Sequence, residues 1–294
     1  MRNRSMAKWI LLVLLCLAVA AQCALPAKPK PTDDDIAIFL KACASGDGRM
    51  VRDALGSRST AELTAARNKV DLSGLDLAAS GNYKNCVTLI LASGAQVNAK
   101  NKTGRTPLAW AAISGQKECA ELLISKGADP KIADDEGNTP LHLAVRFNHK
   151  VCAEALIAKG APLNAMNNTG YTPLHTAVAA GNKDLVEMLL GKGAVANSLA
   201  KDGQTPLHSA ACLPEKDCAE MLIAKGAAIN ARAKDGSTPL HRAASCGSVA
   251  AAELLIDKRA RINAVDRDGN RPLKLALARN DYAMIALLTA HGAK

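Results

Sequence analysis

Four histidines recur at a constant interval along this chain, and histidine is a common ligand for metal ions and a common group for moving protons. They are separated by thirty-three residues each: His142, His175, His208 and His241. Nine cysteines accompany them, and cysteine with histidine makes up the usual ligand set of zinc. Whether these side chains can meet around one ion depends on the elements that carry them.

The same interval governs the residues around the histidines. Thr-Pro-Leu begins at residues 106, 139, 172, 205 and 238, and Arg271-Pro272-Leu273 falls on the next step. A strict period of this length is typical of stacked-repeat proteins, in which each unit buries its apolar faces against its neighbours. The period therefore predicts the scaffold, and function has to be sought in residues that depart from it.

Each unit carries signals for two short helices and a turn. Thr-Pro predicts a helix start, because Thr caps a free N–H and Pro has no N–H to leave unsatisfied. Small residues such as Ala111-Ala112 allow this first helix to lie close to its neighbour, while Cys119 and Leu123 lie at helical spacing on the second helix. Gly127 and its equivalents then end the second helix, and Gly104 and its equivalents allow a tight turn that projects as a finger.

Written out, a unit is Gly-x-Thr-Pro-Leu-His-x-Ala-Ala, a second apolar helix and Gly-Ala-x-x-Asn, with the fullest copies at 170–175 and 236–241. This pattern resembles the ankyrin repeat in motif, length and internal spacing over residues 104–268. The resemblance implies an all-α solenoid of stacked helical hairpins with projecting β-turn fingers. Weaker copies near residues 40–47, 73–75 and 269–294 bring the expected number to eight units, of which the outer two are caps with one polar face.

The repeat argues against a shared metal ion. Equivalent positions in a stack lie about 10 Å apart, whereas all nitrogen ligands of zinc lie about 2 Å from the ion. In the ankyrin family the corresponding histidine is structural, and its ring hydrogen bonds tie neighbouring turns together. No phosphate-binding loop, nucleophile elbow, catalytic carboxylate pair or Cys-His arrangement stands out. We therefore expect no metal, no cofactor and no enzymatic activity.

The cysteines divide into two groups. The first group shares one place in the second helix, where other units carry Leu185 or Ala251, and is expected in the core: Cys86, Cys119, Cys152 and Cys218. Neighbouring helix layers lie about 8 to 10 Å apart, too far for a disulfide, which requires Cα atoms within about 7 Å. The exception is the region around Pro214, where a bridge from Cys212 to Cys218 or to Cys246 stays open.

Two departures from the repeat affect the backbone. Pro214 stands where Gly115 and Gly181 stand in other units, and proline cannot take the positive φ that glycine permits, so this loop has to run differently. Arg259 occupies the helix-ending glycine position, at a modest cost in strain.

The first residues lie outside the stack. A basic start, an apolar run from Trp9 to Ala21 and small residues after it indicate a signal peptide over residues 1–23. The apolar run is short against the roughly 20 residues of a membrane-spanning helix, and an uncleaved anchor is the alternative. Residues 24–35, with alternating Pro and Lys, are expected to form an extended linker before the repeat domain, 36–294.

The expected location is periplasmic or secreted, with a bacterial source favoured. Two Asn-x-Thr sequons, at Asn101 and Asn167, fall on finger tips, where eukaryotic glycans would obstruct binding. The formal net charge of +10 falls by the three charges of Arg2, Arg4 and Lys8 to 10 − 3 = +7 once the signal is removed. These charges are dispersed among acidic residues, and no aromatic-and-basic pattern for nucleic acid is visible.

The resemblance implies that the chain, as a monomer, binds a protein partner on an extended concave surface. The expected contacts are turn positions and the exposed end of the first helix: Lys102, Arg105, Ile113, Arg146, Phe147, Met166, Tyr171, Leu199 and Arg232. Phe147 and Tyr171 fall on adjacent units, and aromatic residues dominate interface energetics, so they form the expected centre; Trp110 is expected to replace a core leucine. The alternative function is a structural spacer tethered to a membrane by an uncleaved N-terminus.

Overall fold

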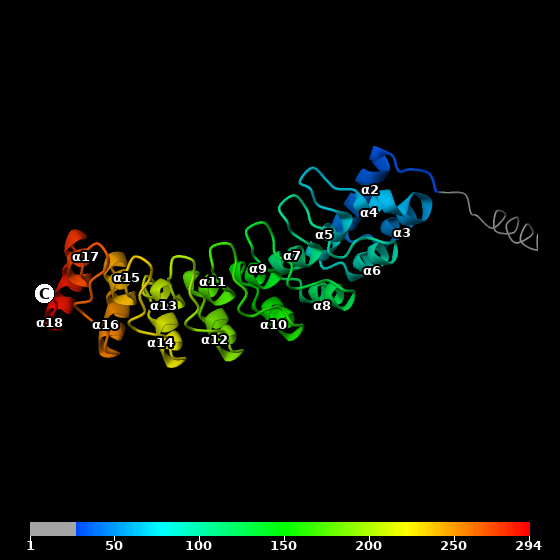
Figure 1. Cartoon of the computed structure of the whole chain (residues 1–294). Helices are drawn as coiled ribbons and strands as arrows, with labels where there is room; N and C mark the ends of the chain where they lie inside the picture. Colours follow the sequence, from blue (N-terminus) through cyan, green and yellow to red (C-terminus); the bar gives the residue numbers. More distant parts are fainter. Residues whose placement is uncertain (1–27) are drawn as a thin grey trace, which may run out of the picture.

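The computed structural model describes residues 28–294, and the predicted signal peptide lies outside this range. Figure 1 shows an elongated, curved stack of helix pairs. The helices are α2 (Asp33–Ser45), α3 (Gly48–Ser57), α4 (Thr60–Ala65), α5 (Gly74–Ser80), α6 (Lys84–Ala92), α7 (Pro107–Ile113), α8 (Lys117–Ser125), α9 (Pro140–Arg146), α10 (Lys150–Ala158), α11 (Pro173–Ala179), α12 (Lys183–Gly191), α13 (Pro206–Ala210), α14 (Asp217–Ala224), α15 (Pro239–Cys246), α16 (Val249–Asp257), α17 (Pro272–Ala278) and α18 (Tyr282–Ala290).

The helices form eight hairpins, as expected, with α4 as an extra helix after the first. We call the first helix of each hairpin the inner helix (α2, α5, α7, α9, α11, α13, α15 and α17) and the second the outer helix. The turn before each inner helix from α7 onward, centred on Gly104, Gly137, Gly170, Gly203, Gly236 or Gly269, is called a finger. The fingers project beside the inner helices, and the outer helices lie on the opposite side of the stack (Figure 1). This is the predicted all-α solenoid.

The core runs the length of the stack. Leu174 and Leu207 begin neighbouring inner helices and are fully buried, as is Leu189 in the outer helix α12. The predicted core cysteines are also buried. Burial raises the pKa of the Cys43 and Cys152 thiols to about 12, so both stay protonated at neutral pH.

The histidines have the structural role that the resemblance implies. In His142 the ring Nδ1 accepts hydrogen bonds from the backbone N–H and the hydroxyl of Thr139, which leaves Nε2–H to donate to the carbonyl of Tyr171 in the next unit at 2.9 Å. The same two-sided contact is repeated in the following units, from His175 to Gln204, from His208 to Ser237 and from His241 to Asn270. Each histidine therefore caps its own helix and ties it to the next finger.

The open question about Cys212 is settled by a disulfide with Cys246, across Cα atoms 5.2 Å apart. The repeat itself makes this place suitable, because Ser80 and Ser114 occupy the equivalent positions four units earlier and their hydroxyls lie 2.7 Å apart. The helix before Pro214, α13, has five residues, whereas α11 has seven. The loop around Pro214 thus runs differently from its equivalents, as predicted.

Both ends of the stack have features of their own. The described part of the linker contacts the first unit: Lys28 Nζ donates to the carbonyl of Leu55, and the carbonyl of Pro29 accepts from Ser59 N–H. At the other end, Leu277 is 52% exposed although Ala244, its equivalent one unit earlier, is fully buried. The last unit therefore keeps an apolar side chain on the face that a polar cap was expected to cover.

Two further features complete the backbone. Arg259 takes a left-handed conformation with φ of 68°, as the glycines that it replaces do. Within residues 28–294, no helix combines the length and the apolar character needed to cross a membrane.

Candidate functional site

A side-chain carbonyl or carboxylate shapes each finger. In the finger before α9, Asp134 Oδ1 accepts from the backbone N–H groups of Glu136 and Asn138 at 3.1 and 2.8 Å. Asn101 and Asn167 make the equivalent bonds in the fingers on either side. Because Asp and Asn side chains can bond to their own backbone two residues on, these residues fix the shape of the turn locally.

The fingers are also bonded to one another. Asp135 N–H donates to the carbonyl of Thr103, and Asn168 N–H donates to the carbonyl of Glu136. This close approach requires glycine at position 137: its φ is 78°, and a Cβ there would lie 2.6 Å from the backbone nitrogen of Asn168. The row of fingers is therefore a continuous, hydrogen-bonded surface.

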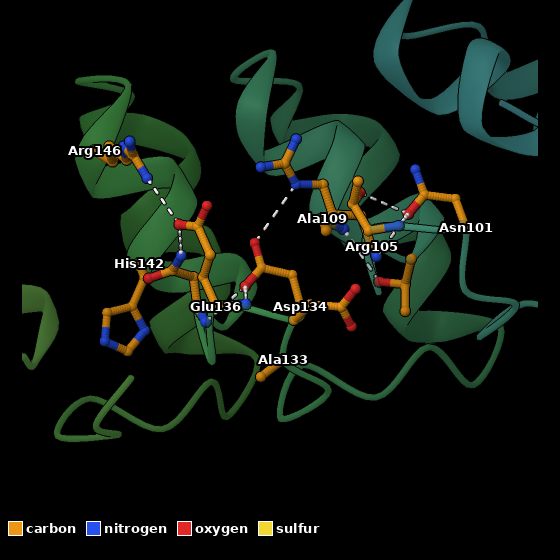
Figure 2. A network of polar contacts seen from close by, with 12 residues as sticks. Asn101, Arg105, Ala109, Ala133, Asp134, Glu136, His142 and Arg146 are labelled. Carbon is orange, nitrogen blue, oxygen red and sulfur yellow. Dashed lines mark hydrogen bonds and ion pairs between the residues drawn. The ribbon is translucent and has the colours of Figure 1, made fainter. Parts of the chain in front are cut away.

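One ion pair joins the fingers before α7 and α9, and a second joins the latter finger to the helix α9 (Figure 2). Arg105 Nε lies 3.5 Å from Asp134 Oδ2, and the Asp134 side chain is almost completely buried. The Arg105 guanidinium also lies 5.5 Å from the centre of the Trp110 ring. Arg146 Nη1 lies 3.3 Å from Glu136 Oε2. These contacts hold the cationic side chains in defined positions on the face.

The predicted contact residues are largely accessible. Arg105, Ile113 and Tyr171 are half-buried, and the rest are exposed: Lys102, Arg146, Phe147, Met166, Leu199 and Arg232. Arg232 is held by a hydrogen bond of 2.7 Å from Nη2 to the carbonyl of Val265. The backbone of Lys102 donates to the Asp71 carboxylate.

Phe147 and Tyr171, the expected centre, do not form a compact pair. Phe147 follows the last residue of α9 and is 46% exposed. Tyr171 lies before the start of α11, on the finger side, where its ring stacks on His175 at 5.2 Å between centres. Phe147 thus lies at the C-terminal end of α9, and Tyr171 lies at the N-terminal end of the neighbouring helix α11. Each helix has seven residues and is about 10 Å long, so the two rings lie at opposite ends of the inner helices.

Met166 and Leu199 are exposed apolar side chains at the same repeat position on neighbouring fingers, and each is 56% exposed. Val265 stands at this position two units beyond Leu199 and is 39% exposed. Tyr171 lies on the finger of Met166. These three residues, Met166, Tyr171 and Leu199, are called the apolar finger patch below.

Three residues of this face were not among the expected contacts. Trp110 stands at the position of the fully buried Leu143 in the next unit, as expected, but is itself only half-buried, and its Nε1 has no hydrogen-bond acceptor. Arg242 occupies the same repeat position four units later. The available signal was the variability of this position, which is occupied by Leu143, Thr176 and Ser209 in the three units between. Asp134 could be found only from its contacts.

The face continues at its N-terminal end as a cavity of about 490 Å³ beside α2 and α5. Apolar residues such as Ile36, Leu40 and Leu77 line it together with Lys41 and Lys69. Among residues 28–294, no three His, Cys, Asp or Glu side chains are placed to hold a metal ion.

Comparison with known families gives one result. A family model for ankyrin repeats (3 copies) matches the chain in five overlapping segments: residues 38–134, 75–167, 126–199, 162–233 and 215–294. Together these segments run through the whole hairpin stack from α2 to α18. A search of curated proteins found no match.

Proposed function

The chain belongs to the ankyrin repeat family, and from this premise we propose that it is an exported module that recognises one partner protein. Ankyrin repeats are in general protein-interaction modules, and proteins built from them are typically non-enzymatic scaffolds. The proposed binding site is the surface formed by the fingers and the inner helices, and the proposed chemistry is recognition without catalysis by a monomer.

The observation that carries this proposal is the apolar finger patch. Met166 and Leu199 are more than half exposed on neighbouring fingers, and these fingers are held rigid by hydrogen bonds within and between them. A preorganised surface loses little conformational entropy on binding. Exposed apolar side chains on such a surface are typical of an interaction site.

Export is supported by two independent features. The N-terminal sequence has the layout of a signal peptide, and Cys246, one partner of the disulfide, is exposed. Disulfides persist mainly in oxidising compartments such as the periplasm. The test is to fractionate cells and sequence the N-terminus: a soluble chain that begins near residues 20–24 supports export, whereas an intact chain in the membrane fraction supports the tethered spacer instead.

The binding site is tested by affinity capture with matched variants. Met166→Ser with Leu199→Ser removes the two exposed side chains of the apolar finger patch, and Val151→Ser with Val195→Ser removes two exposed apolar side chains on or next to the outer helices α10 and α12. We expect the first variant to lose its partner and the second to retain it, with equal thermal stability. Equal capture by both variants would place the site elsewhere.

A further inference from the structure

The charged side chains of the inner helices from α7 onward all have the same sign, apart from histidine. From α7 to α17 they contain Arg146, Arg242 and Lys274 but not a single carboxylate. In contrast, each outer helix from α8 to α16 contains at least one Asp or Glu. The inner helices from α7 to α17 therefore contribute only positive charge, although the fingers beside them carry carboxylates such as Asp135, Glu136 and Asp202.

Among residues 28–294 the half-buried side chain of Arg242 has no partner, unlike three other arginines of this surface. Arg105, Arg146 and Arg232 are each engaged, in an ion pair or in a hydrogen bond to a backbone carbonyl. The guanidinium of Arg242, by contrast, takes part in no hydrogen bond or ion pair among residues 28–294. Its Nε is buried without an acceptor. A half-buried cation without an acceptor is costly unless something else completes it.

The residues near Arg242 do not supply a partner for its charge. The equivalent residue one unit earlier is the short Ser209. The charge of Arg242 affects the pKa of Asp235. However, Asp235 Oδ1 already accepts hydrogen bonds from the N–H and the hydroxyl of Ser237 at 2.8 and 2.6 Å. Burial opposes ionisation of Asp235, but the bonds from Ser237 and the charge of Arg242 together lower its pKa. Asp235 is thus held in its finger and does not pair with Arg242.

We propose that Arg242 binds a carboxylate of an extended, acidic segment of the partner protein, and that an apolar side chain of the same segment packs on Met166 and Leu199. This inference rests on the proposed function. Arg242 lies in α15, two units beyond the finger of Met166. Two units correspond to about 20 Å, and an extended chain rises about 3.3 Å per residue. The recognised segment therefore has a carboxylate about six residues from an apolar anchor.

Defined peptides test this recognition with the full chain. The probe is a fluorescent twelve-residue peptide with Leu and Glu six residues apart, made in both directions, and its control carries Gln in place of Glu. Fluorescence anisotropy measures the dissociation constants. We expect one direction of the Glu peptide to bind at least tenfold more tightly than its Gln control, because a charge-assisted hydrogen bond is involved.

Matched arginine variants locate the contact. Arg242→Gln should remove the preference for Glu over Gln, and Arg242→Lys should restore part of it. Arg261→Gln removes the same charge from the exposed loop after the outer helix α16 and should leave the preference unchanged. Equal losses in Arg242→Gln and Arg261→Gln, or equal binding of the Glu and Gln peptides, would overturn the inference. So would tighter Arg242-dependent binding of a single-stranded oligonucleotide of the same charge.

The inference can fail while the proposed function survives. If capture of the natural partner is lost in Met166→Ser with Leu199→Ser but unaffected by Arg242→Gln, the face binds a protein and Arg242 does not read a carboxylate. If both variants capture the partner as well as the original chain does, the proposed site itself is wrong.

Discussion

At the scale of single residues, Asp134 shows how one side chain can serve the fold and the surface together. Its Oδ1 accepts the backbone bonds that shape the finger, and its Oδ2 pairs with Arg105. In the neighbouring fingers Asn101 and Asn167 perform the first task without a charge. The two tasks can therefore be separated by substitution.

Asp134→Ala removes both contacts and should lower the free energy of unfolding by about 1 to 2 kcal/mol, since two backbone donors, one of them buried, lose their acceptor. Asp134→Asn keeps the turn and loses only the pairing with partly exposed Arg105, at a cost of at most about 1 kcal/mol. Urea denaturation measures both changes. If the Asn variant is as destabilised as the Ala variant, the turn does not depend on this acceptor.

The buried histidines predict an acid-sensitive fold. Burial lowers the pKa of His142, His175, His208 and His241. The unfolded chain therefore binds protons at a higher pH than the native chain does, and the free energy of unfolding should fall as pH drops below about 6.5. Urea denaturation between pH 7.5 and 5 measures this slope.

A single substitution checks the origin of that slope. His175→Asn should be less stable at pH 7.5, because the bonds to Thr172 and Gln204 are weakened, yet its stability should change less with pH. A slope that is unchanged or steeper would show that other groups cause the acid sensitivity.

At the scale of the elements, a recurring asparagine contact joins neighbouring units. Where one unit lacks this asparagine, the next unit also lacks the backbone N–H that would donate to it. Asn98 donates to the carbonyl of Gly127 and accepts from Asp129 N–H in the next unit, and Asn197, Asn230 and Asn263 repeat this contact. One unit has Lys131 in place of the asparagine, and the residue that would donate to it is Pro162, which has no N–H. The interruption therefore leaves no donor unsatisfied.

The helix starts, turns and core could be predicted because they depend on neighbouring residues. Thr172-Pro173 begins a helix whatever lies beyond it. The functional surface was less predictable because it depends on how side chains of different units meet. The ion pair of Arg105 with Asp134 and the lack of an acceptor for Arg242 Nε are visible only in the structure. Phe147 and Tyr171 were expected to form one centre because they belong to adjacent units. That expectation did not consider that they lie at opposite ends of the inner helices.

The disulfide gives a prediction for one junction of the stack. Cys212 and Cys246 join the ends of α13 and α15 and close a loop for which chain entropy predicts a stabilisation of about 3 to 4 kcal/mol. A reductant should lower the melting temperature, and Cys212→Ser with Cys246→Ser should abolish that effect. The buried thiols provide the control, because Cys152→Ser should leave the response to reductant intact.

At the scale of the whole molecule, stability comes from contacts between adjacent units only. Leu189→Ala in the middle of the stack should cost about 2 to 5 kcal/mol, because Leu189 is fully buried. Lys201→Ala on an exposed finger should change the free energy of unfolding by less than about 0.5 kcal/mol. Thermal and urea denaturation compare the two, and equal losses would contradict the repeat alignment.

The stack also presents two different sides to its surroundings. The inner helices from α7 to α17 carry cations and no carboxylate, and the fingers beside them carry exposed apolar residues, whereas each outer helix from α8 to α16 carries at least one carboxylate. Because equivalent positions repeat along the molecule, a partner segment can contact several units at once. The division of the surface into two sides is therefore the feature that links the repeat to binding.

Photo-crosslinking inside the source cells tests this division most directly. A photoreactive benzoylphenylalanine is placed either at Leu199, in the apolar finger patch, or at exposed Glu187 in the outer helix α12. We predict one discrete crosslinked protein from position 199 and none from position 187. The same crosslinked protein from position 187 alone, with none from position 199, would show that the finger and inner-helix face is not the binding site.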